Sequence, residues 1–433
     1  MIELVSCARA LVGGVEHANY AFVVENGRIS AAGDCPRIKR EHPANRGRSF
    51  GTSSLVVPGF INGHSHAYQI LLRGWADDLT FERWRREALY RVIPQLDADD
   101  VYWVFVAAFS EMLAAGITTV AEFFYLNGRG NALARAAIRA CKDVGIRLIF
   151  ARTWMDAEYL PEAFRETTDV ARDRTEALIE EFPEIMVCPA PHSLHACSPA
   201  MIQEASRLSR ARDLPMHIHV AEARYEVQRT LAELGATPIH ALAALDVLND
   251  RLIAVHAIYV SEEEKDAIAQ AGASIIHNPM TNQYLGDGIC DVTGYRRRGV
   301  AVGLGTDANV NPSILEEMRA ASLLQKLQAC DASVTRAADG FAMGTWQGAA
   351  ALRTSAGDLT VGSPADYCVI DASRIDAWSG AVNALVYRAD RSWVQNTFVG
   401  GRELYVHSQE SHLGERASGA LIEIAAKLDL PGS

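Results

Sequence analysis

Eight apolar runs of strand character recur between residues 56 and 307, and they alternate with longer stretches that have helical spacing. Runs that stay apolar along most of their length are typical of strands buried on both faces, as in a parallel sheet covered by helices. Eight parallel strands with intervening helices predict a closed (β/α)8 barrel, and an open doubly wound sheet is the alternative that the strand count disfavours. The runs are VVPGFINGHSH, GITTVAEFF, IRLIFART, IMVCPAPHS, PMHIHVAE, LIAVHAI, ASIIHNP and AVGLGTD.

The two ends of the chain carry a different pattern of short strands and tight turns. Asn26 and Gly27 predict a hairpin within AFVVENGRISAAG, and Gly400 and Gly401 predict another within SWVQNTFVGGRELYV. A helical tail, LIEIAAKLD, follows. We therefore expect an α/β protein in which residues 58–357 form the TIM-type barrel. Residues 1–57 and 358–433 are expected to form one discontinuous β-sandwich domain with a C-terminal helix.

Charge and composition exclude several classes of partner. The formal net charge of the 433 residues is −12, and no run of lysine and arginine offers a basic field, so we expect no nucleic acid. No apolar stretch approaches the roughly 20 residues of a membrane span. The start MIELVSCARALVGG lacks the pattern of a signal peptide, which predicts a cytoplasmic location and no membrane contact. The eight cysteines are scattered without a CxxC pair and are expected to be reduced.

Polar residues stand at the ends of several predicted strands, where barrels of this class place their catalytic groups. They are His64 and His66 in the first run, His219 and Glu222 in the fifth, His256 in the sixth and Asp307 in the eighth. Strand residues two apart point to the same face, so the first two imidazoles can reach one ion from one side. A chance convergence of all these groups in barrel order is improbable.

One divalent metal ion is the ligand that these residue types favour, zinc first and iron second. The predicted shell of three nitrogens and one carboxylate oxygen leaves room for a water, as in catalytic sites, and it consists of His64, His66, His219 and Asp307. His217 and His277 are expected to be hydrogen-bonded core groups, because a lone buried histidine is more often structural than a ligand.

HSH, HVAE, VHA and GLGTD, in this order, resemble the amidohydrolase superfamily, and specifically its cytosine-deaminase-like and triazine-hydrolase-like branch of single-metal enzymes. The resemblance covers nearly the whole chain, including PADYCVIDA and VGGRELY near its end. Members with two metals carry a carboxylated lysine at a middle strand end, whereas IRLIFARTWMD and IMVCPAPHSLH offer none. The resemblance therefore implies one metal ion, a small-molecule substrate and, as in relatives, a homodimer.

Within that branch, HSHAYQ, AEFFYLN, APHSLHA and LGDGI are most similar to formimidoylglutamate deiminases. This resemblance implies substrate contacts by Gln69, Tyr125 and His192, and a substrate carboxylate bound by Arg86. His195 occupies a position where those enzymes have an arginine, and an imidazole does not replace a guanidinium as a bidentate donor. We expect His195 to contact either substrate or a backbone carbonyl.

Other stretches, including LLRGWADDLTFERW and NPMTNQYLGDG, are also similar to adenosine-type, pterin-type and triazine aminohydrolases. The substrate class thus stays open between a formimidoyl amino acid and an aminated heterocycle. Hydrolysis of a different C–N or C–halide bond on a triazine-like ring is one alternative, and a non-catalytic metabolite-binding barrel is another. Residues 73–91, rich in arginine, are expected to overhang the barrel mouth as a lid.

The resemblance also assigns catalytic roles. A divalent metal lowers the pKa of its water from about 16 toward 7 and so makes hydroxide available to attack an amidine carbon. Glu222 is expected to take the proton of the water and pass it to the departing nitrogen, which leaves as ammonia. His256 is expected to steady the tetrahedral centre, and Asp307 to shuttle a proton as well as bind metal. Structural alternatives are a helix cap for Glu222 and an orienting hydrogen bond for His256.

Overall fold

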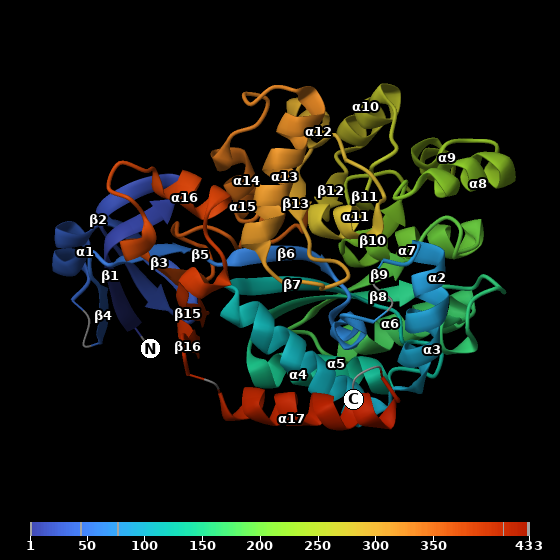
Figure 1. Ribbon diagram of the computed structural model, residues 1–433, viewed down its shortest axis with the longest axis horizontal. Helices are drawn as coiled ribbons and strands as arrows, with labels where there is room; N and C mark the ends of the chain where they lie inside the picture. Colours follow the sequence, from blue (N-terminus) through green and yellow to red (C-terminus); the bar gives the residue numbers. More distant parts are fainter. Residues whose placement is uncertain (1, 44–45, 76–77, 410, 431–433) are drawn as a thin grey trace.

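The computed structural model describes residues 2–43, 46–75, 78–409 and 411–430. Eight parallel strands within this part of the chain follow one another in sequence order as two four-stranded sheets, β6-β7-β8-β9 and β10-β11-β12-β13 (Figure 1). The strands are β6 (Phe60–Ser65), β7 (Ile117–Phe124), β8 (Arg147–Trp154), β9 (Met186–Pro191), β10 (Met216–Val220), β11 (Leu252–His256), β12 (Ser274–His277) and β13 (Val302–Leu304).

Two short bridges close these sheets into a barrel. A parallel bridge between Ser193 and His219 joins the end of β9 to β10, and another between Ser65 and Asp307 joins β6 to the residues after β13. At the second seam the backbone amide of His66 donates to the carbonyl of Asp307 over 2.9 Å. The predicted eight-stranded barrel is confirmed, and both seams pass through predicted metal ligands.

Helices cover the outside of the barrel (Figure 1). Residues that favour helix ends mark their limits: Ser261 and Glu264 form a reciprocal capping box at the start of α10, and Gly272 ends it with a φ of 70°. A cap of this kind contributes about 1 kcal/mol. The helices are α4 (Ala98–Ala114), α5 (Ala132–Val144), α6 (Thr168–Glu181), α7 (Pro199–Arg212), α8 (Arg224–Leu234), α9 (Pro238–Ala244), α10 (Glu262–Ala271), α11 (Pro279–Leu285), α12 (Val292–Arg297), α13 (Ile314–Ala329), α14 (Ala337–Met343) and α15 (Trp346–Ala351).

The segment after β6 forms one wall of the barrel mouth through short helical pieces. They are the 3-10 helix η1 (Ala67–Leu72), α2 (Phe81–Trp84), the π-helical turn η2 (Arg85–Leu89) and α3 (Tyr90–Val92). Several side chains of α2, η2 and α3 line a cavity at the ends of the strands. Residues 76 and 77 of the predicted lid lie outside the described residues.

Both ends of the chain contribute strands to one further sheet, in the order β16-β15-β14-β5-β1-β2-β3, with β4 also paired to β1. The two predicted hairpins are present, with positive φ at both turn residues: 50° and 77° at Asn26 and Gly27, and 57° and 76° at Gly400 and Gly401. The strands are β1 (Ile2–Val12), β2 (Val15–Glu25), β3 (Arg28–Asp34), β4 (Gly47–Phe50), β5 (Ser54–Pro58), β14 (Tyr367–Asp371), β15 (Val394–Val399) and β16 (Arg402–Val406).

This terminal sheet curls around its own core. The rings of Phe22 on β2 and Tyr367 on β14 lie 5.3 Å apart although β1 and β5 separate their strands in the sheet. Phe50 and Phe398 make a second such contact, with ring centroids 6.2 Å apart. The expected sandwich is therefore one continuous hydrogen-bonded sheet folded over a buried aromatic cluster. The short helices α1 (Cys35–Glu41) and α16 (Ala381–Tyr387) accompany these terminal segments.

The C-terminal helix α17 (His412–Lys427) packs on the barrel, whereas the sequence placed it with the terminal β domain. It lies along α4 (Figure 1). The Lys427 ammonium contacts Asp97 and Asp100 at 2.7 and 2.6 Å, and the Arg416 guanidinium carbon lies 4.7 Å from the centre of the six-membered face of Trp103. Charge and aromatic complementarity with α4 thus decide its position. In the part of the chain described, no helix has the length and apolar character needed to cross a membrane.

Candidate active site

Four side chains from three distant places in the sequence converge at the carboxyl ends of the barrel strands. One ligand atom from each lies within 4.8 Å of those of the others, and the four residues are His64, His66, His219 and Asp307. All four are buried. Nε2 of His64 lies 3.1 Å from Nε2 of His219 and 3.5 Å from Asp307 Oδ1. The structure therefore brings the whole predicted metal shell together.

Hydrogen bonds from the far side of two rings fix their orientation. Nδ1 of His66 lies 2.9 Å from the carbonyl oxygen of Phe123, and Nδ1 of His219 lies 3.1 Å from that of His192. A carbonyl can only accept, so Nδ1 carries the proton in both rings and Nε2 presents a lone pair to the centre. Burial, with a further contribution from His64, lowers the pKa of His66 to about 3, which keeps that ring neutral.

The carboxylate of the shell is ionised. Burial opposes the charge, but a hydrogen bond with His64 and the nearby His256 outweigh burial and hold the pKa of Asp307 below its usual value. Three imidazole nitrogens and one carboxylate are a donor set that suits a single divalent ion such as zinc. Nε2 of His219 presents its lone pair to Nε2 of His64 at 3.1 Å, and Nδ1 of His64 has no hydrogen-bond partner among the described residues, so the residues fit a cation at their centre.

The backbone at these strand ends adopts a conformation that L-residues rarely use. Positive φ angles occur at Ala221 (52°), His256 (70°), Ala257 (47°) and Asp307 (50°). Such conformations cost on the order of 1–3 kcal/mol each and persist only where the surroundings enforce them. The barrel therefore uses local strain to turn these side chains toward one point above the strands.

Glu222 and His256 lie on the open side of the metal shell. His256 Nε2 is 3.6 Å from Glu222 Oε1 and 3.5 Å from Asp307 Oδ2. The Oδ1 of Asn282, 3.0 Å from His256 Nδ1, orients the ring. Burial, followed by the neighbouring carboxylate of Glu226, raises the pKa of Glu222 well above its usual value. A carboxyl group whose pKa is raised holds a proton more readily than an exposed one, as a group that accepts and returns a proton must.

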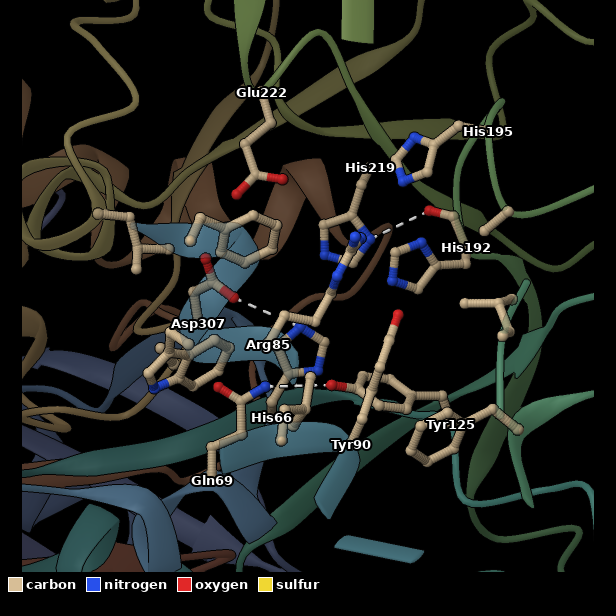
Figure 2. Close-up of a pocket in the computed structure, with 18 of the residues that line it drawn as sticks. His66, Gln69, Arg85, Tyr90, Tyr125, His192, His195, His219, Glu222 and Asp307 are labelled. Carbon is tan, nitrogen blue, oxygen red and sulfur yellow. Dashed lines mark hydrogen bonds and ion pairs between the residues drawn. The ribbon is translucent and has the colours of Figure 1, made fainter. Parts of the chain in front are cut away.

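The predicted substrate contacts surround a cavity that opens over the shell (Figure 2). Gln69, Tyr125, His192 and His195 all line it. Gln69 donates to the hydroxyl of Tyr125 over 3.2 Å, while the Gln69 carbonyl oxygen is buried without a partner among the described residues. These polar groups interrupt a largely aromatic wall whose other members include Phe81, Trp84, Tyr90, Tyr159 and Phe164.

Arg86 does not lie in this cavity, and its predicted role as a carboxylate ligand is wrong. Its side chain is 64% exposed and pairs with Glu87 over 3.3 Å. The preceding residue, Arg85, lines the cavity instead, with its guanidinium carbon 5.7 and 5.4 Å from the ring centroids of Phe81 and Tyr90 (Figure 2). Both arginines lie in the π-helical turn of residues 85–89, in which the Arg85 side chain faces the cavity and the Arg86 side chain faces solvent.

Sequence reasoning also missed three positioning residues. Glu226, one turn of α8 beyond Glu222, lines the cavity and accepts the backbone N–H of Glu222 over 3.0 Å. Glu122, at the end of β7, is fully buried and accepts the N–H of Ala67, the residue after His66, at both oxygens over 3.0 Å. Asn282 orients His256. Of these three residues, only Glu226 had a signal in the sequence, which was its spacing of four residues from Glu222.

The two histidines that were left out of the shell are core residues, as expected, but their expected hydrogen bonds are absent. The rings of His217 and His277 are fully buried, and their nitrogens have no hydrogen-bond partner among the described residues. Burial lowers the pKa of each to about 3, and each is therefore neutral. His217 lies within β10, and His277 is the last residue of β12.

A closed barrel with this shell, an adjacent carboxyl group of raised pKa and an enclosed cavity defines a metal-dependent hydrolase. A family model for the amidohydrolase family matches residues 55–404, and the chain belongs to that family. It is a hydrolytic enzyme acting on non-peptide C–N bonds.

Several relatives are similar along most of their length. A 5'-deoxyadenosine deaminase of Methanothermobacter thermautotrophicus is 31% identical over 87% of this chain and 88% of its own. A 5-methylthioadenosine/S-adenosylhomocysteine deaminase of Syntrophobacter fumaroxidans is 31% identical over 88% and 87%.

Solved structures of similar proteins have the same fold. A zinc-bound adenosine deaminase from Xanthomonas campestris is 27% identical, with a TM-score of 0.90 over 98% of both chains. An atrazine chlorohydrolase of Arthrobacter aurescens in complex with zinc shares the fold, with 22% identity and a TM-score of 0.88 over 98% of this chain and 99% of the other.

Proposed function

We propose that the chain hydrolytically deaminates an aminated heterocycle of the adenine-nucleoside type, using one zinc ion. The observation that carries this proposal is the position of Glu222 beside the shell: its carboxyl oxygen lies 3.6 Å from His256, which in turn lies 3.5 Å from Asp307. Relatives that act on 5'-deoxyadenosine and methylthioadenosine support the substrate class, as does the zinc-bound adenosine deaminase structure.

The residues divide the reaction as follows. A divalent ion, held by the four shell residues, supplies Lewis-acid activation of water at neutral pH. Glu222 removes a proton from the attacking water and delivers it to the amino nitrogen that leaves. The new C–O bond thus replaces the C–N bond, and ammonia departs while Glu222 returns to its starting state. His256 Nε2, within 3.6 Å of both Glu222 and Asp307, relays a proton between the two carboxylates.

The cavity wall suits a flat ring. Tyr125, Trp84 and Phe164 present aromatic faces and edges, and the centroids of Tyr125 and Phe164 lie 5.3 Å apart at 87°. Aromatic walls hold planar heterocycles by offset or edge contacts worth about 1 kcal/mol each beyond their area. A ring held there would bring an exocyclic amino group toward Glu222.

A second candidate substrate is an N-formimidoyl amino acid, and Arg85 is the observation that favours it. No carboxylate of the described residues lies within ion-pair distance of its guanidinium, which faces the cavity (Figure 2). An unpaired cation beside a site selects an anionic group on the ligand. The same residue would equally bind a nucleoside that carries a carboxylate substituent.

An ammonia-release screen tests these proposals. Zinc-loaded and iron-loaded protein is incubated with adenosine-type nucleosides, with and without an anionic substituent, and with formimidoyl amino acids, pterins and aminated triazines. Release of ammonia from a nucleoside, with the hydroxylated heterocycle as product, supports the first proposal. Ammonia from formimidoyl amino acids alone would replace it with the second. Release of halide or alkylamine would show that a different bond is cleaved, and an unchanged ligand would indicate a binding protein.

Assembly and location remain predictions from the sequence. The resemblance to dimeric relatives supports a homodimer. Light scattering of the purified protein measures the first, and fractionation of cells that express the natural gene measures the second.

A further inference from the structure

A continuous row of four polar side chains connects helix α8 to the cavity. Glu226 Oε1 lies 3.4 Å from Nδ1 of His195, and His195 Nε2 lies 3.3 Å from the hydroxyl of Ser193. That hydroxyl lies 2.9 Å from Nδ1 of His192. Ser193 and Glu226 are buried and His195 is nearly so, which excludes bulk water from the row. Figure 2 shows His195 behind His192, on the side away from the metal shell.

The groups in this row have a defined order of donors and acceptors. Glu226 already accepts the backbone N–H of Glu222, as a carboxylate does. Its other oxygen lies 3.4 Å from Nδ1 of His195, which favours the proton on that nitrogen, because two unprotonated acceptors at this distance would repel each other; Nε2 of that ring is then an acceptor. The Ser193 hydroxyl must then donate to His195, and its oxygen accepts the proton of His192 Nδ1. Burial lowers the pKa of His195, and a neutral ring there is consistent with this order.

The row ends on a lone pair that faces the cavity. With its proton on Nδ1, His192 presents an unprotonated Nε2, which has no hydrogen-bond partner among the described residues. The ring is held in place, because it stacks on His219 with centroids 4.8 Å apart at 29° and its carbonyl accepts the N–H of His219 over 2.9 Å. His192 is therefore a rigid acceptor at the wall of the site.

We propose that Glu226, His195 and Ser193 are positioning residues that make His192 a hydrogen-bond acceptor, so that the enzyme selects substrates with an N–H or O–H donor at that point. The proposal rests on the proposed function and refines its substrate class. A ribose hydroxyl or the N–H of a formimidoyl amino acid satisfies His192, whereas an unprotonated ring nitrogen placed there is repelled. The position of His195 is thereby explained without any direct contact to substrate.

The tautomer of His192 is measurable without turnover. In metal-loaded protein labelled with 15N-histidine, we expect His192 Nε2 to give a pyridine-type resonance and Nδ1 a pyrrole-type one, with the His192→Gln variant used only for assignment. A pyrrole-type Nε2 in wild-type protein would overturn the proposal. This measurement is independent of ammonia release, so an inactive protein with the expected tautomer would count against the proposed function alone.

The Glu226→Gln variant should reverse the direction of every hydrogen bond along the row. Its amide oxygen must still accept from the Glu222 N–H, so its NH2 group faces His195, and each donor and acceptor along the row exchanges places until His192 Nε2 carries the proton. Glu233→Gln, on the same helix but paired with Arg229 at the surface, is the matched control and should leave the His192 tautomer unchanged. An unchanged His192 tautomer in Glu226→Gln would overturn the proposal.

Substrate preference supplies the second readout. Adenosine is compared with analogues in which each ribose hydroxyl is replaced in turn by fluorine, which only accepts. In wild-type protein one replacement should lower kcat/KM by about tenfold, the value of one lost hydrogen bond, and Glu226→Gln should abolish or invert that difference. Equal losses in wild type and variant for every analogue would contradict the proposal. If only formimidoyl amino acids react, N-methylation of the substrate provides the same comparison.

Discussion

The Nε2 atoms of His64 and His219 lie 3.1 Å apart, although 155 residues separate them in the chain. The seam that joins β9 to β10 places His219 at one side of the barrel mouth, and the end of β6 supplies His64. His219 has its proton on Nδ1, so its Nε2 offers only a lone pair to its neighbour. This contact is favourable when a cation lies between the rings.

Loss of a shell ligand should therefore remove the metal. We expect His219→Ala to reduce metal content from about one ion per chain to near zero and to abolish activity, because three remaining ligands no longer complete the shell. His240→Ala, at an exposed position of helix α9, is the control and should retain the ion. Elemental analysis measures the metal content, and one ion per chain in His219→Ala would contradict the assigned shell.

Removal of the metal ion by a chelator should lower the thermal midpoint of unfolding. An ion present at a hundred times its Kd stabilises the folded protein by about 3 kcal/mol.

Glu222 should be required for proton transfer but not for metal binding. Glu222→Gln keeps the shape of the side chain and removes its ability to exchange a proton, so kcat should fall by about 100- to 10,000-fold. Metal content should stay at the wild-type level. Ammonia release gives the rate, and Glu233→Gln, exposed on the following helix α8, should behave as wild type. Near-normal kcat in Glu222→Gln would exclude it as the proton carrier.

Adjacent arginines provide a matched test of anion binding. Arg85→Met should raise the KM of an anionic substrate by about ten- to a hundredfold, the loss expected for a charge-assisted hydrogen bond, with little effect on an uncharged one. Arg86→Met should change neither, because that side chain is 64% exposed and outside the cavity. Steady-state kinetics on charged and uncharged substrates distinguishes the two. An equal response of both variants would remove Arg85 from the site.

A buried ion pair beneath the barrel rim should control stability. Arg152 and Glu166 form a bidentate pair at 2.8 and 2.9 Å, with side chains 0% and 1% exposed. Arg152→Met leaves the carboxylate of Glu166 with only Arg174 as its cation, so we expect a loss of about 3–5 kcal/mol in the free energy of unfolding.

The surface pair Arg83 and Glu87 is the control for this change. Arg83→Met should cost less than about 1 kcal/mol, because both side chains are solvent-exposed. Urea denaturation followed by circular dichroism measures both variants. Losses of similar size would mean that burial does not decide the strength of the Arg152 pair.

Local chemistry made the barrel and its metal shell predictable. The strand-end position of HSH, and of the later histidines and aspartate, depends on the two-residue periodicity of strands and on the rule that parallel strands end at one edge. Turn residues with positive φ, such as Gly27 and Gly401, likewise identified both hairpins. These features were readable because each depends on residues close in sequence.

Features that depend on packing between distant segments were not readable. The resemblance implied Arg86 as the substrate ligand, whereas packing turns Arg85 into the cavity, and α17 lies along α4 and not on the terminal sheet. The row from Glu226 to His192 joins helix α8 to the loop after β9, and nothing in either segment alone indicates it.

The sequence by itself thus determined the strand order, the residues of the predicted metal shell and the carboxylate that we propose as proton carrier, since alternating side-chain direction and residue chemistry are local properties. Only the tertiary structure decided which arginine faces the cavity and which nitrogen of His192 carries its proton. Both features follow from contacts between segments that only the fold brings together. In the row that ends at His192, the position of one donor fixes the direction of each later hydrogen bond.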